Sequence, residues 1–133
     1  MRTEDYVTLG EFRYSLRRFL RFSKDYLRAA AGLTPEQYEA LLAIKAFNES
    51  RSLNISELSE RLQVKHHSAI SIVDRLADQN LIRREPSATD RRKRHLELTV
   101  KGEEVIEELG VVHRNELRAR SAEMIKLLER LRE

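Results

Sequence analysis

The sequence has no cysteine and no tryptophan, and only two prolines and four glycines among 133 residues. The lack of cysteine excludes disulfides, thiolate zinc sites, a cysteine nucleophile and a thiol-based redox switch. So few prolines and glycines argue against a sheet-rich fold with many turns. No apolar run reaches the roughly 18 to 20 residues of a membrane span, and no signal-peptide core follows Met1. These absences predict a soluble, mainly helical, cytoplasmic domain that does not enter a membrane.

The sequence also lacks the motifs of common enzymes and cofactor sites. It contains no glycine-rich phosphate loop, no His-Glu-x-x-His and no evident pair of nucleophile and base. The adjacent His66 and His67 would point about 100° apart on a helix, so they cannot easily share one metal ion. His95 and His113 are the only other histidines, and no acidic cluster completes a ligand set. We therefore predict no catalysis, no metal and no cofactor.

Charge is distributed unevenly along the chain. There are 25 Lys and Arg against 22 Asp and Glu, for a net charge of +3. The stretch 83–95, RREPSATDRRKRH, holds six of the basic residues and two of the acidic ones, which leaves nineteen basic and twenty acidic residues elsewhere. A basic excess confined to one short segment is typical of proteins that bind a polyanion. A merely solvated charged loop is the alternative that composition leaves open.

Two long helices are predicted at the ends of the chain. Thr8-Leu9-Gly10-Glu11 has the pattern of a capping box and Gly32 suits the left-handed position after a helix, so the first helix is expected over residues 8–32. Thr99 is the expected N-cap of a long helix in residues 100–133, with Ser121 as a candidate cap of a separate last segment. Both helices carry more apolar residues than the intervening segment can cover. This surplus predicts a homodimer formed through both ends of the chain.

The sequence predicts three shorter helices within residues 34–99. Capping boxes that start at Thr34 and Asn54 each precede apolar residues at helical spacing. A turn at residues 63–65 then leads to a helix that ends at Asn80, the non-glycine residue best suited to a left-handed cap. Two helices separated by such a short turn form a helix-turn-helix.

Two short strands follow, at residues 81–84 and 95–98, around a polar loop. Leu96 and Leu98 would point to one face and Glu97 to the other, as a half-buried strand requires. A helix-turn-helix followed by a basic hairpin is a winged helix. A plain helical bundle with a surface hairpin is the alternative reading.

Four stretches of the sequence resemble the MarR (multiple-antibiotic-resistance regulator) family. They are LTPEQYEALLAI, ISELSERLQV, VDRLADQNLIRR and DRRKRHLELTVKG. The last stretch is the most specific, because Asp90-Arg91-Arg92 followed by Leu98-Thr99 and Gly102 matches the D-x-R…L-T-x-x-G hallmark of the wing and the next helix. The resemblance covers nearly the whole chain as a single domain. It implies an obligate homodimer whose terminal helices interlock and whose two lobes grip a palindromic operator, and hence a transcriptional repressor.

The resemblance places the recognition helix at residues 66–79. Candidate contacts on and before this helix are Lys65, His66, His67, Ser68, Ser71 and Arg75, with the first turns nearest the base edges of the major groove. A salt bridge to an acid such as Asp78 is the alternative role of Arg75. The opening Lys65-His66-His67-Ser68 departs from the family's commoner Ser/Pro/Ser/Thr run, so the resemblance says little about which bases are read. Asn80 stands where the family usually has glycine.

The wing provides the second set of candidate DNA contacts. Its residues are Arg84, Asp90, Arg91, Arg92, Lys93 and Arg94. Cations on such a loop neutralise phosphates and provide salt-dependent affinity. By resemblance, Asp90 and Arg92 brace the wing, and an arginine there reaches the minor groove.

The resemblance also implies a small aromatic ligand, often an acid, that binds between the dimer helices and the lobe and relieves repression. Candidate pocket residues are Tyr14, Arg17, Arg18, Tyr38 and His113, and packed or solvated helix positions are the alternative for each. A winged-helix dimer that binds another protein and no DNA is the alternative function. The six cations of residues 83–95 disfavour it, because lysine is depleted at protein interfaces and charges there lie at the rim.

Overall fold

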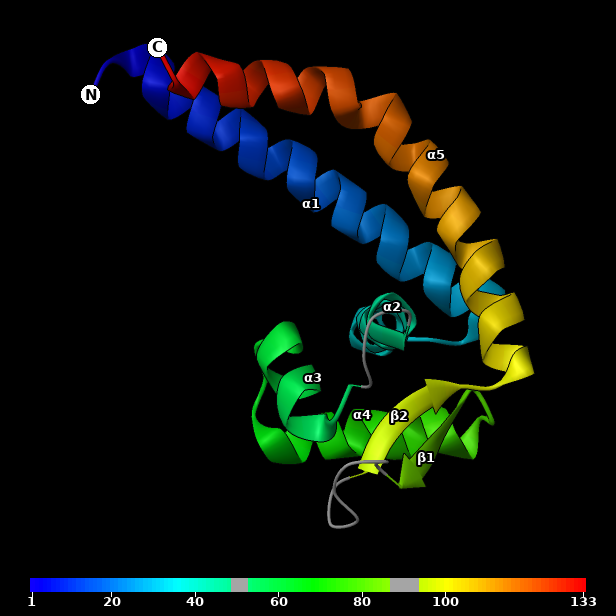
Figure 1. Cartoon of the computed structure of the whole chain (residues 1–133). Helices are drawn as coiled ribbons and strands as arrows, with labels where there is room; N and C mark the ends of the chain where they lie inside the picture. Colours follow the sequence, from blue (N-terminus) through cyan, green and yellow to red (C-terminus); the bar gives the residue numbers. More distant parts are fainter. Residues whose placement is uncertain (49–52, 87–93) are drawn as a thin grey trace.

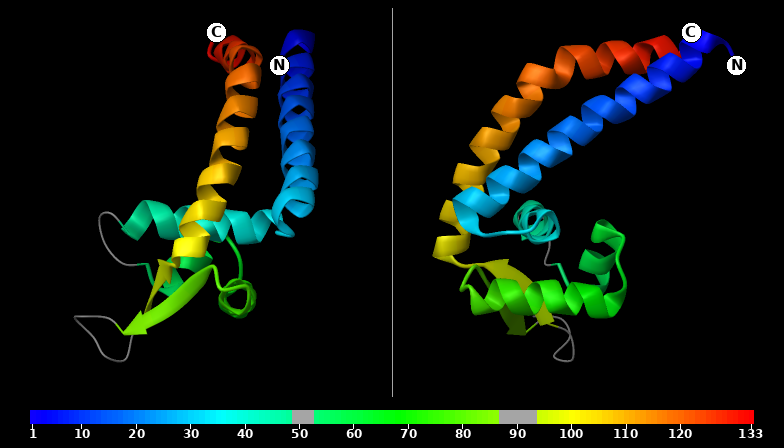
Figure 2. Two further views of the ribbon diagram at one scale, coloured as in Figure 1. Left: turned by 90° about the vertical axis from the view of Figure 1, so that its right-hand side faces the viewer. Right: turned by 180° about the vertical axis from the view of Figure 1, so that it is seen from behind.

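The computed structural model describes residues 1–48, 53–86 and 94–133. Its elements in chain order are α1 (Thr3–Ala31), α2 (Pro35–Asn48), α3 (Ile55–Leu62), α4 (His66–Asp78), β1 (Ile82–Pro86), β2 (Arg94–Leu98) and α5 (Val100–Leu131). α1 and α5 run side by side away from a lobe that holds α2, α3, α4 and the hairpin, and both chain ends lie at the far tip (Figure 1, Figure 2). This architecture confirms the predicted winged helix-turn-helix with long terminal helices. Within the described ranges, no helix combines the length and apolar character needed to cross a membrane.

The helices of the lobe begin and end where the capping patterns predicted. At α2, the Gln37 N–H donates to the Thr34 hydroxyl at 3.2 Å, and the Thr34 N–H donates to the Gln37 side chain at 3.0 Å. At α3, Asn54 and Glu57 make the same reciprocal pair at 2.8 and 3.3 Å. Asn80 has a φ of 61° just after α4, as predicted. Side chains that satisfy the first N–H groups of each helix thus set the helix bounds.

The two strands form the predicted antiparallel hairpin, with Ile82 opposite Leu98. Leu96 and Leu98 are buried, whereas Glu97 lies on the more exposed face. A third, one-residue strand was not predicted: the Leu96 N–H donates to the Leu53 carbonyl at 2.9 Å. A single bridging residue has no alternating pattern, so the sequence held no strand signal there.

The hydrophobic core occupies the lobe and reaches only the adjoining ends of the long helices. α1 contributes Leu27, and α5 contributes Ile106 and Leu109. The lobe contributes Leu33, Tyr38, Leu41, Ile44, Leu53, Leu58, Val73, Leu76, Leu81, Ile82, Leu96 and Leu98. One core therefore fixes the lobe to the base of both long helices.

Farther from the lobe, α1 and α5 leave many apolar side chains exposed. Where α1 packs on α5, the buried residues include the small and polar Thr8, Ser15 and Ser23. The exposed apolar residues are Tyr6, Val7, Leu9, Tyr14 and Leu20 on α1, and Val111, Leu117, Ile125, Leu128 and Leu131 on α5. The expected surplus of apolar surface is present on both helices. That these faces pair with a second copy stays a prediction.

Two predicted helix starts are wrong. α1 begins at Thr3 instead of Thr8, and its cap is the Arg2 N–H donating to the Asp5 carboxylate at 2.9 Å. The Thr8 hydroxyl instead donates to the Glu4 carbonyl at 2.8 Å inside the helix. Likewise α5 is continuous through Ser121, whose hydroxyl donates to the Arg118 carbonyl at 2.9 Å. Serine and threonine can bond to a preceding carbonyl within a helix as readily as they cap one, which explains both errors.

Candidate nucleic-acid interface

The helix α4 has one buried face and one exposed face. Ala69, Val73 and Leu76 are buried at the helical spacing of three and four residues. On the other side, Lys65, His66, His67, Ser71 and Arg75 are exposed, and Ser68 is half-buried. The structure thus brings all six candidate residues of the recognition helix to one end and one outer face of α4. Arg75 makes no ion pair with another described residue, in contrast to the alternative considered for it.

The N-terminal end of α4 has the electrostatic properties of an anion site. Its N-cap, Lys65, makes no side-chain capping bond, and its first turn contains no acidic residue. The N–H groups of His66 and His67 precede the first helical hydrogen bond, which the Ser68 N–H makes to the Lys65 carbonyl at 3.0 Å. The partial positive charge of the helix end therefore remains uncompensated beside a lysine. Such an end suits a phosphate oxygen.

An ion pair joins the hairpin to α4. Arg84 on β1 bonds to Asp74 on the exposed side of α4. Arg84 was predicted as a DNA contact, and the structure places its guanidinium between the strand and the helix. This contact positions the hairpin relative to the recognition helix. Arg94 begins β2, and Asp90, Arg91, Arg92 and Lys93 lie outside the described residues.

The outer face of the hairpin carries a second set of charged pairs. Arg83 contacts Glu97 at 2.9 Å and Glu85 at 3.0 Å, and His95 Nε2 lies 3.0 Å from Glu97. The hydrogen bond from His95 and, after it, the bond and charge of Arg83 lower the pKa of Glu97, although partial burial opposes them. Glu97 therefore holds both strands together as a carboxylate.

The start of α5 is bound directly to the end of α4. The Thr99 hydroxyl donates to the Asn80 carbonyl at 2.7 Å and accepts from the Gly102 N–H at 3.0 Å. Lys101 Nζ donates to the Gln79 carbonyl at 3.1 Å. A Cβ at Gly102 would lie 2.1 Å from the Leu81 carbonyl oxygen, so only glycine allows this close approach. The Leu-Thr-x-x-Gly motif is thus the joint between the recognition helix and α5.

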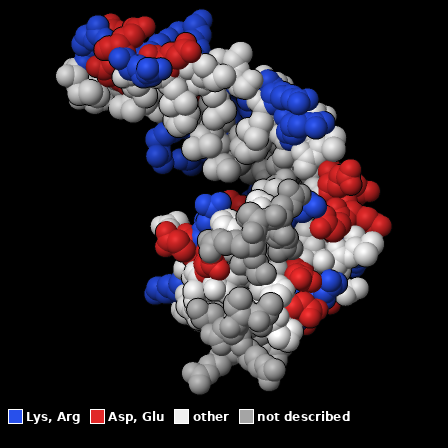
Figure 3. Space-filling model, viewed as in Figure 1, with Lys and Arg blue, Asp and Glu red and all other residues white. Residues whose placement is uncertain are grey.

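Acidic residues gather over the first turns of α5, whereas both signs of charge occur farther along this helix (Figure 3). The acidic residues of these turns are Glu103, Glu104, Glu107 and Glu108. Because carboxylates repel DNA phosphates, the first turns of α5 are a less suitable surface for DNA than the end of α4.

A cavity of about 490 Å³ lies between α1, α2 and α5. Its lining residues are Phe19, Leu20, Ser23, Lys24, Pro35, Glu36, Tyr38, Glu39, Leu42, His113 and Leu117. Of the five predicted ligand residues, Tyr38 and His113 line it. Tyr14, Arg17 and Arg18 do not: all three are exposed on α1, where the Arg18 guanidinium lies 5.6 Å from the centre of the Tyr14 ring. We refer to this cavity below as the α1–α2–α5 pocket.

His113 connects the three helices around this pocket. Its Nδ1 lies 2.7 Å from the Leu109 carbonyl and its Nε2 lies 2.8 Å from the Ser23 hydroxyl. A carbonyl only accepts, so in a neutral ring Nδ1 carries the hydrogen and Nε2 accepts from Ser23. The ring stacks on Tyr38 at 4.6 Å between centroids, and burial raises the pKa of that tyrosine. Ser23, the partner of His113 on α1, was not predicted, because a contact between two helices leaves no local motif in the sequence.

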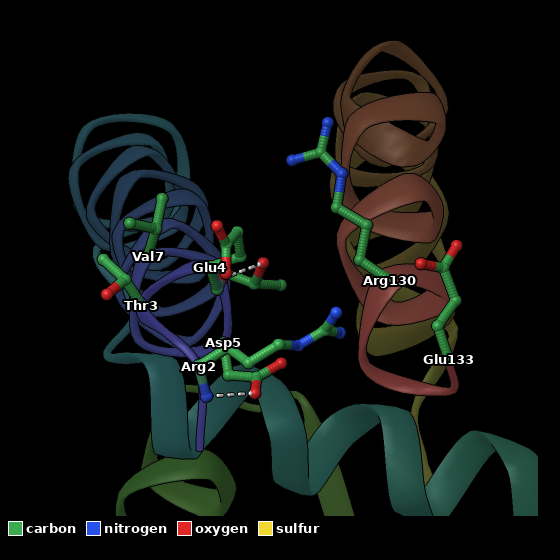
Figure 4. Close-up of a pocket in the computed structure, with 8 residues that line it drawn as sticks. Arg2, Thr3, Glu4, Asp5, Val7, Arg130 and Glu133 are labelled. Carbon is green, nitrogen blue, oxygen red and sulfur yellow. Dashed lines mark hydrogen bonds between the residues drawn. The ribbon is translucent and has the colours of Figure 1, made fainter.

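A second cavity, of about 530 Å³, lies at the far tip between the start of α1 and the end of α5 (Figure 4). Arg2, Glu4 and Asp5 face Arg130 and Glu133 across it, so two cations and three carboxylates line this cavity. It is remote from the lobe and shares no residue with the predicted sites. No group of three or more metal-ligating side chains occurs anywhere in the described ranges.

The fold and the exposed α4 define a winged helix-turn-helix protein with a long antiparallel pair of terminal helices. Residues 31–93 match the sequence profile of the MarR family. The repressor MdtR of Bacillus subtilis is 38% identical over 78 residues, which cover 59% of this chain and 48% of MdtR. The repressor MprA of Escherichia coli is 33% identical over 87 residues, covering 65% of this chain and 49% of MprA. The chain thus spans about half the length of these curated relatives.

Solved structures show the same fold. MepR, a transcription regulator of the Staphylococcus aureus multidrug efflux pump MepA, superposes with a TM-score of 0.75 at 20% identity, covering 90% of this chain and 95% of MepR. A MepR mutant bound to an oligodeoxyribonucleotide gives a TM-score of 0.70 at 20% identity, covering 98% and 99%. Over residues 31–93 the chain is thus similar to the MarR family, and these solved structures share its fold.

Proposed function

We propose that this protein is a homodimeric, DNA-binding transcriptional regulator and not an enzyme, and that it represses a palindromic operator until a small ligand binds. The observation that carries the proposal is the exposed face of α4, whose uncapped N-terminal end bears Lys65, His66 and His67. The relatives MdtR and MprA are named repressors, which supports the same class of function. A MepR mutant with this fold binds an oligodeoxyribonucleotide, which supports DNA as the polyanion.

The end of α4 and the wing would make different kinds of contact with DNA. The N-terminal end of α4 enters the major groove, where His67, Ser68 and Ser71 reach base edges. Lys65 and the basic residues of the wing neutralise phosphates and provide most of the salt-dependent affinity. The Arg84–Asp74 pair keeps the hairpin at a fixed position relative to α4, so both surfaces contact the same duplex in one register.

A dimer would place two such lobes on one operator. If the exposed faces of α1 and α5 pair with a second copy, a two-fold axis relates the two α4 helices. Half-sites should then form an inverted repeat with centres about one helical turn, roughly 10 bp, apart. Footprinting that shows one unpaired half-site would contradict this geometry.

Ligand relief would act through the α1–α2–α5 pocket. His113 and Tyr38 line this pocket and join α5 to α1 and α2. The Thr99–Asn80 bond joins the other end of the same stretch of α5 to α4. A small aromatic ligand that changes how α5 packs on α2 would therefore change the separation of the two recognition helices. Release of DNA follows because both can no longer reach their half-sites.

A mobility-shift assay with DNA flanking the protein's own gene tests the proposal. We expect a complex that forms with a specific duplex, survives excess nonspecific DNA and weakens steeply as salt rises. Lys65→Ala should weaken it, and Lys126→Ala, on α5 away from α4, is the matched control. A dimer that binds no DNA even at low salt would instead support the alternative of a protein-binding module.

A further inference from the structure

The α1–α2–α5 pocket combines an apolar lining with an excess of negative charge. Phe19, Leu20 and Leu42 are among its apolar residues. Its charged side chains are two carboxylates, Glu36 and Glu39, and one ammonium, Lys24. Among its Lys, Arg, Asp and Glu residues, the lining therefore has one more negative than positive group. Its volume of about 490 Å³ is within the range of small-molecule sites.

The two carboxylates are already unfavourably placed with respect to each other. Burial raises the pKa of Glu39, and the neighbouring charge of Glu36 raises it further. The repulsion from Glu36 disfavours a further negative charge beside these two exposed carboxylates. A bound cation would remove the repulsion between these two groups, because an opposite charge close by favours the ionised form of a carboxylate.

A carboxylate on a ligand, in contrast, would meet few N–H donors and few cations in the pocket. The start of α2 lies there, but Pro35 has no N–H, and the N–H of Gln37 already bonds to the Thr34 hydroxyl. Glu36 itself occupies the first turn, where a bound anion would otherwise profit from the helix dipole. Arginines that the family resemblance suggested for binding an acid, Arg17 and Arg18, do not line the pocket. Lys24 is the one described cation of the lining.

We propose that the α1–α2–α5 pocket binds small lipophilic aromatic cations in preference to aromatic acids. Glu36 and Glu39 attract the charge, and Phe19 and Tyr38 are the aromatic residues of the lining. The regulatory meaning of this site rests on the proposed function, since a cation would act as inducer only if the protein binds DNA. The preference for one sign of charge does not depend on DNA.

Two ions of the same size and shape test the proposal. Tetraphenylphosphonium and tetraphenylborate differ in the sign of their charge, and isothermal titration calorimetry gives the affinity of the full-length protein for each. We expect the phosphonium to bind at least tenfold more tightly than the borate. Glu39→Gln and Glu36→Gln should each weaken phosphonium binding about fivefold, as expected for a partly exposed ion pair. Glu108→Gln, an exposed carboxylate on α5 outside the pocket, is the control and should change neither affinity.

Several results would overturn the charge preference. They are equal or tighter binding of tetraphenylborate, no binding of either ion at millimolar concentration, and equal phosphonium affinities in wild type and both glutamine variants. Circular dichroism confirms that the variants are folded. A parallel anisotropy titration with DNA separates the two proposals: a protein that binds the phosphonium but no DNA refutes the repressor role and leaves the pocket assignment standing.

Discussion

Because glycine has no Cβ, position 102 allows the residues that follow α4 to lie against α5. The Leu81 carbonyl oxygen occupies the space that any larger side chain at Gly102 would need, 2.1 Å from an ideal Cβ. That carbonyl also accepts the Thr99 N–H at 3.0 Å, so it cannot move away without losing this bond. The Leu81 carbonyl oxygen thus both excludes a larger side chain at position 102 and accepts the Thr99 hydrogen bond.

We predict that Gly102→Ala destabilises the fold by about 1–3 kcal/mol, the range for overpacked sites. Gly110→Ala is the matched control, because Gly110 is in the same helix and a Cβ there meets nothing within 4 Å. In that position alanine should stabilise the helix by up to about 1 kcal/mol. Urea denaturation of both variants measures the difference. Equal free energies of unfolding for the two variants would show that the contact with Leu81 carries no strain.

The lowered pKa of Glu97 predicts that the stability of the fold depends on pH. Its pKa is lowered in the folded state by His95 and Arg83, so ionised Glu97 stabilises the fold above its ordinary pKa of 4.5. This contribution is lost as the pH falls below that value and through the folded-state pKa. We expect Glu97→Gln to lower the melting temperature at pH 7 and to lower it progressively less towards pH 3. Glu97 is one-third exposed, so the effect should not exceed about 1 kcal/mol. A gap between the two melting curves that stays constant with pH would argue against this role.

At the scale of the elements, local chemistry predicted most helix ends. Thr34, Asn54, Asn80 and Thr99 each use the bond or dihedral angle expected of them, because their partners lie within four residues. Errors arose where the same residue type has two local uses, as at Thr8. Contacts between elements could not be predicted, because two charged residues far apart in sequence have many potential partners and only the packed chain selects one pair.

The contact between Arg84 and Asp74 is one feature that only the packed chain determines. The set of residues that lines the α1–α2–α5 pocket is another. Tyr38 and His113 were predicted because the family resemblance implies a ligand site between the helices that carry them. The carboxylates Glu36 and Glu39 were missed, since exposed glutamates on a helix normally indicate only solvation.

Substitutions in the proposed recognition helix and substitutions in the wing should affect DNA binding differently. Arg92→Ala removes a phosphate or minor-groove contact and loosens the wing, so affinity for every sequence should fall. The slope of log K against log salt should become shallower by about one unit for each lost phosphate contact. Anisotropy titrations at several salt concentrations measure both quantities.

His67→Ala and Ser68→Ala should instead lower the ratio of specific to nonspecific binding. A base-edge contact discriminates by about 1–3 kcal/mol, whereas a phosphate contact does not discriminate. His67 is exposed and Ser68 is half-buried on α4, so neither substitution should unfold the core. If specific and nonspecific affinities fall together, these positions do not read bases.

At the scale of the whole molecule, the outer halves of α1 and α5 expose many apolar side chains. Ile125, Leu128 and Leu131 are each at least 40% exposed near the end of α5. A second copy that covers them would make folding and association one process, so the melting temperature should rise with protein concentration. Light scattering should report a dimer at micromolar concentration.

Ile125→Asp should shift this equilibrium towards monomer, because a carboxylate is costly to bury in an apolar interface. Val100→Asp is the control: Val100 is 76% exposed at the first position of α5, where an acidic residue is favourable. A wild-type protein that is monomeric at micromolar concentration, with a melt independent of concentration, would rule out the dimer.

The join between the hairpin and α5 is only one residue long, since β2 ends at Leu98 and α5 begins at Val100. Thr99 fills this join, and its hydroxyl and N–H bond to the Asn80 and Leu81 carbonyls. One residue inserted between Leu98 and Val100 would therefore separate the first turn of α5 from the end of α4. In the proposed dimer, held by the far ends of the helices, such an insertion would change the separation of the two α4 helices. We therefore expect the length of this join to set which spacing of half-sites the proposed dimer can bind.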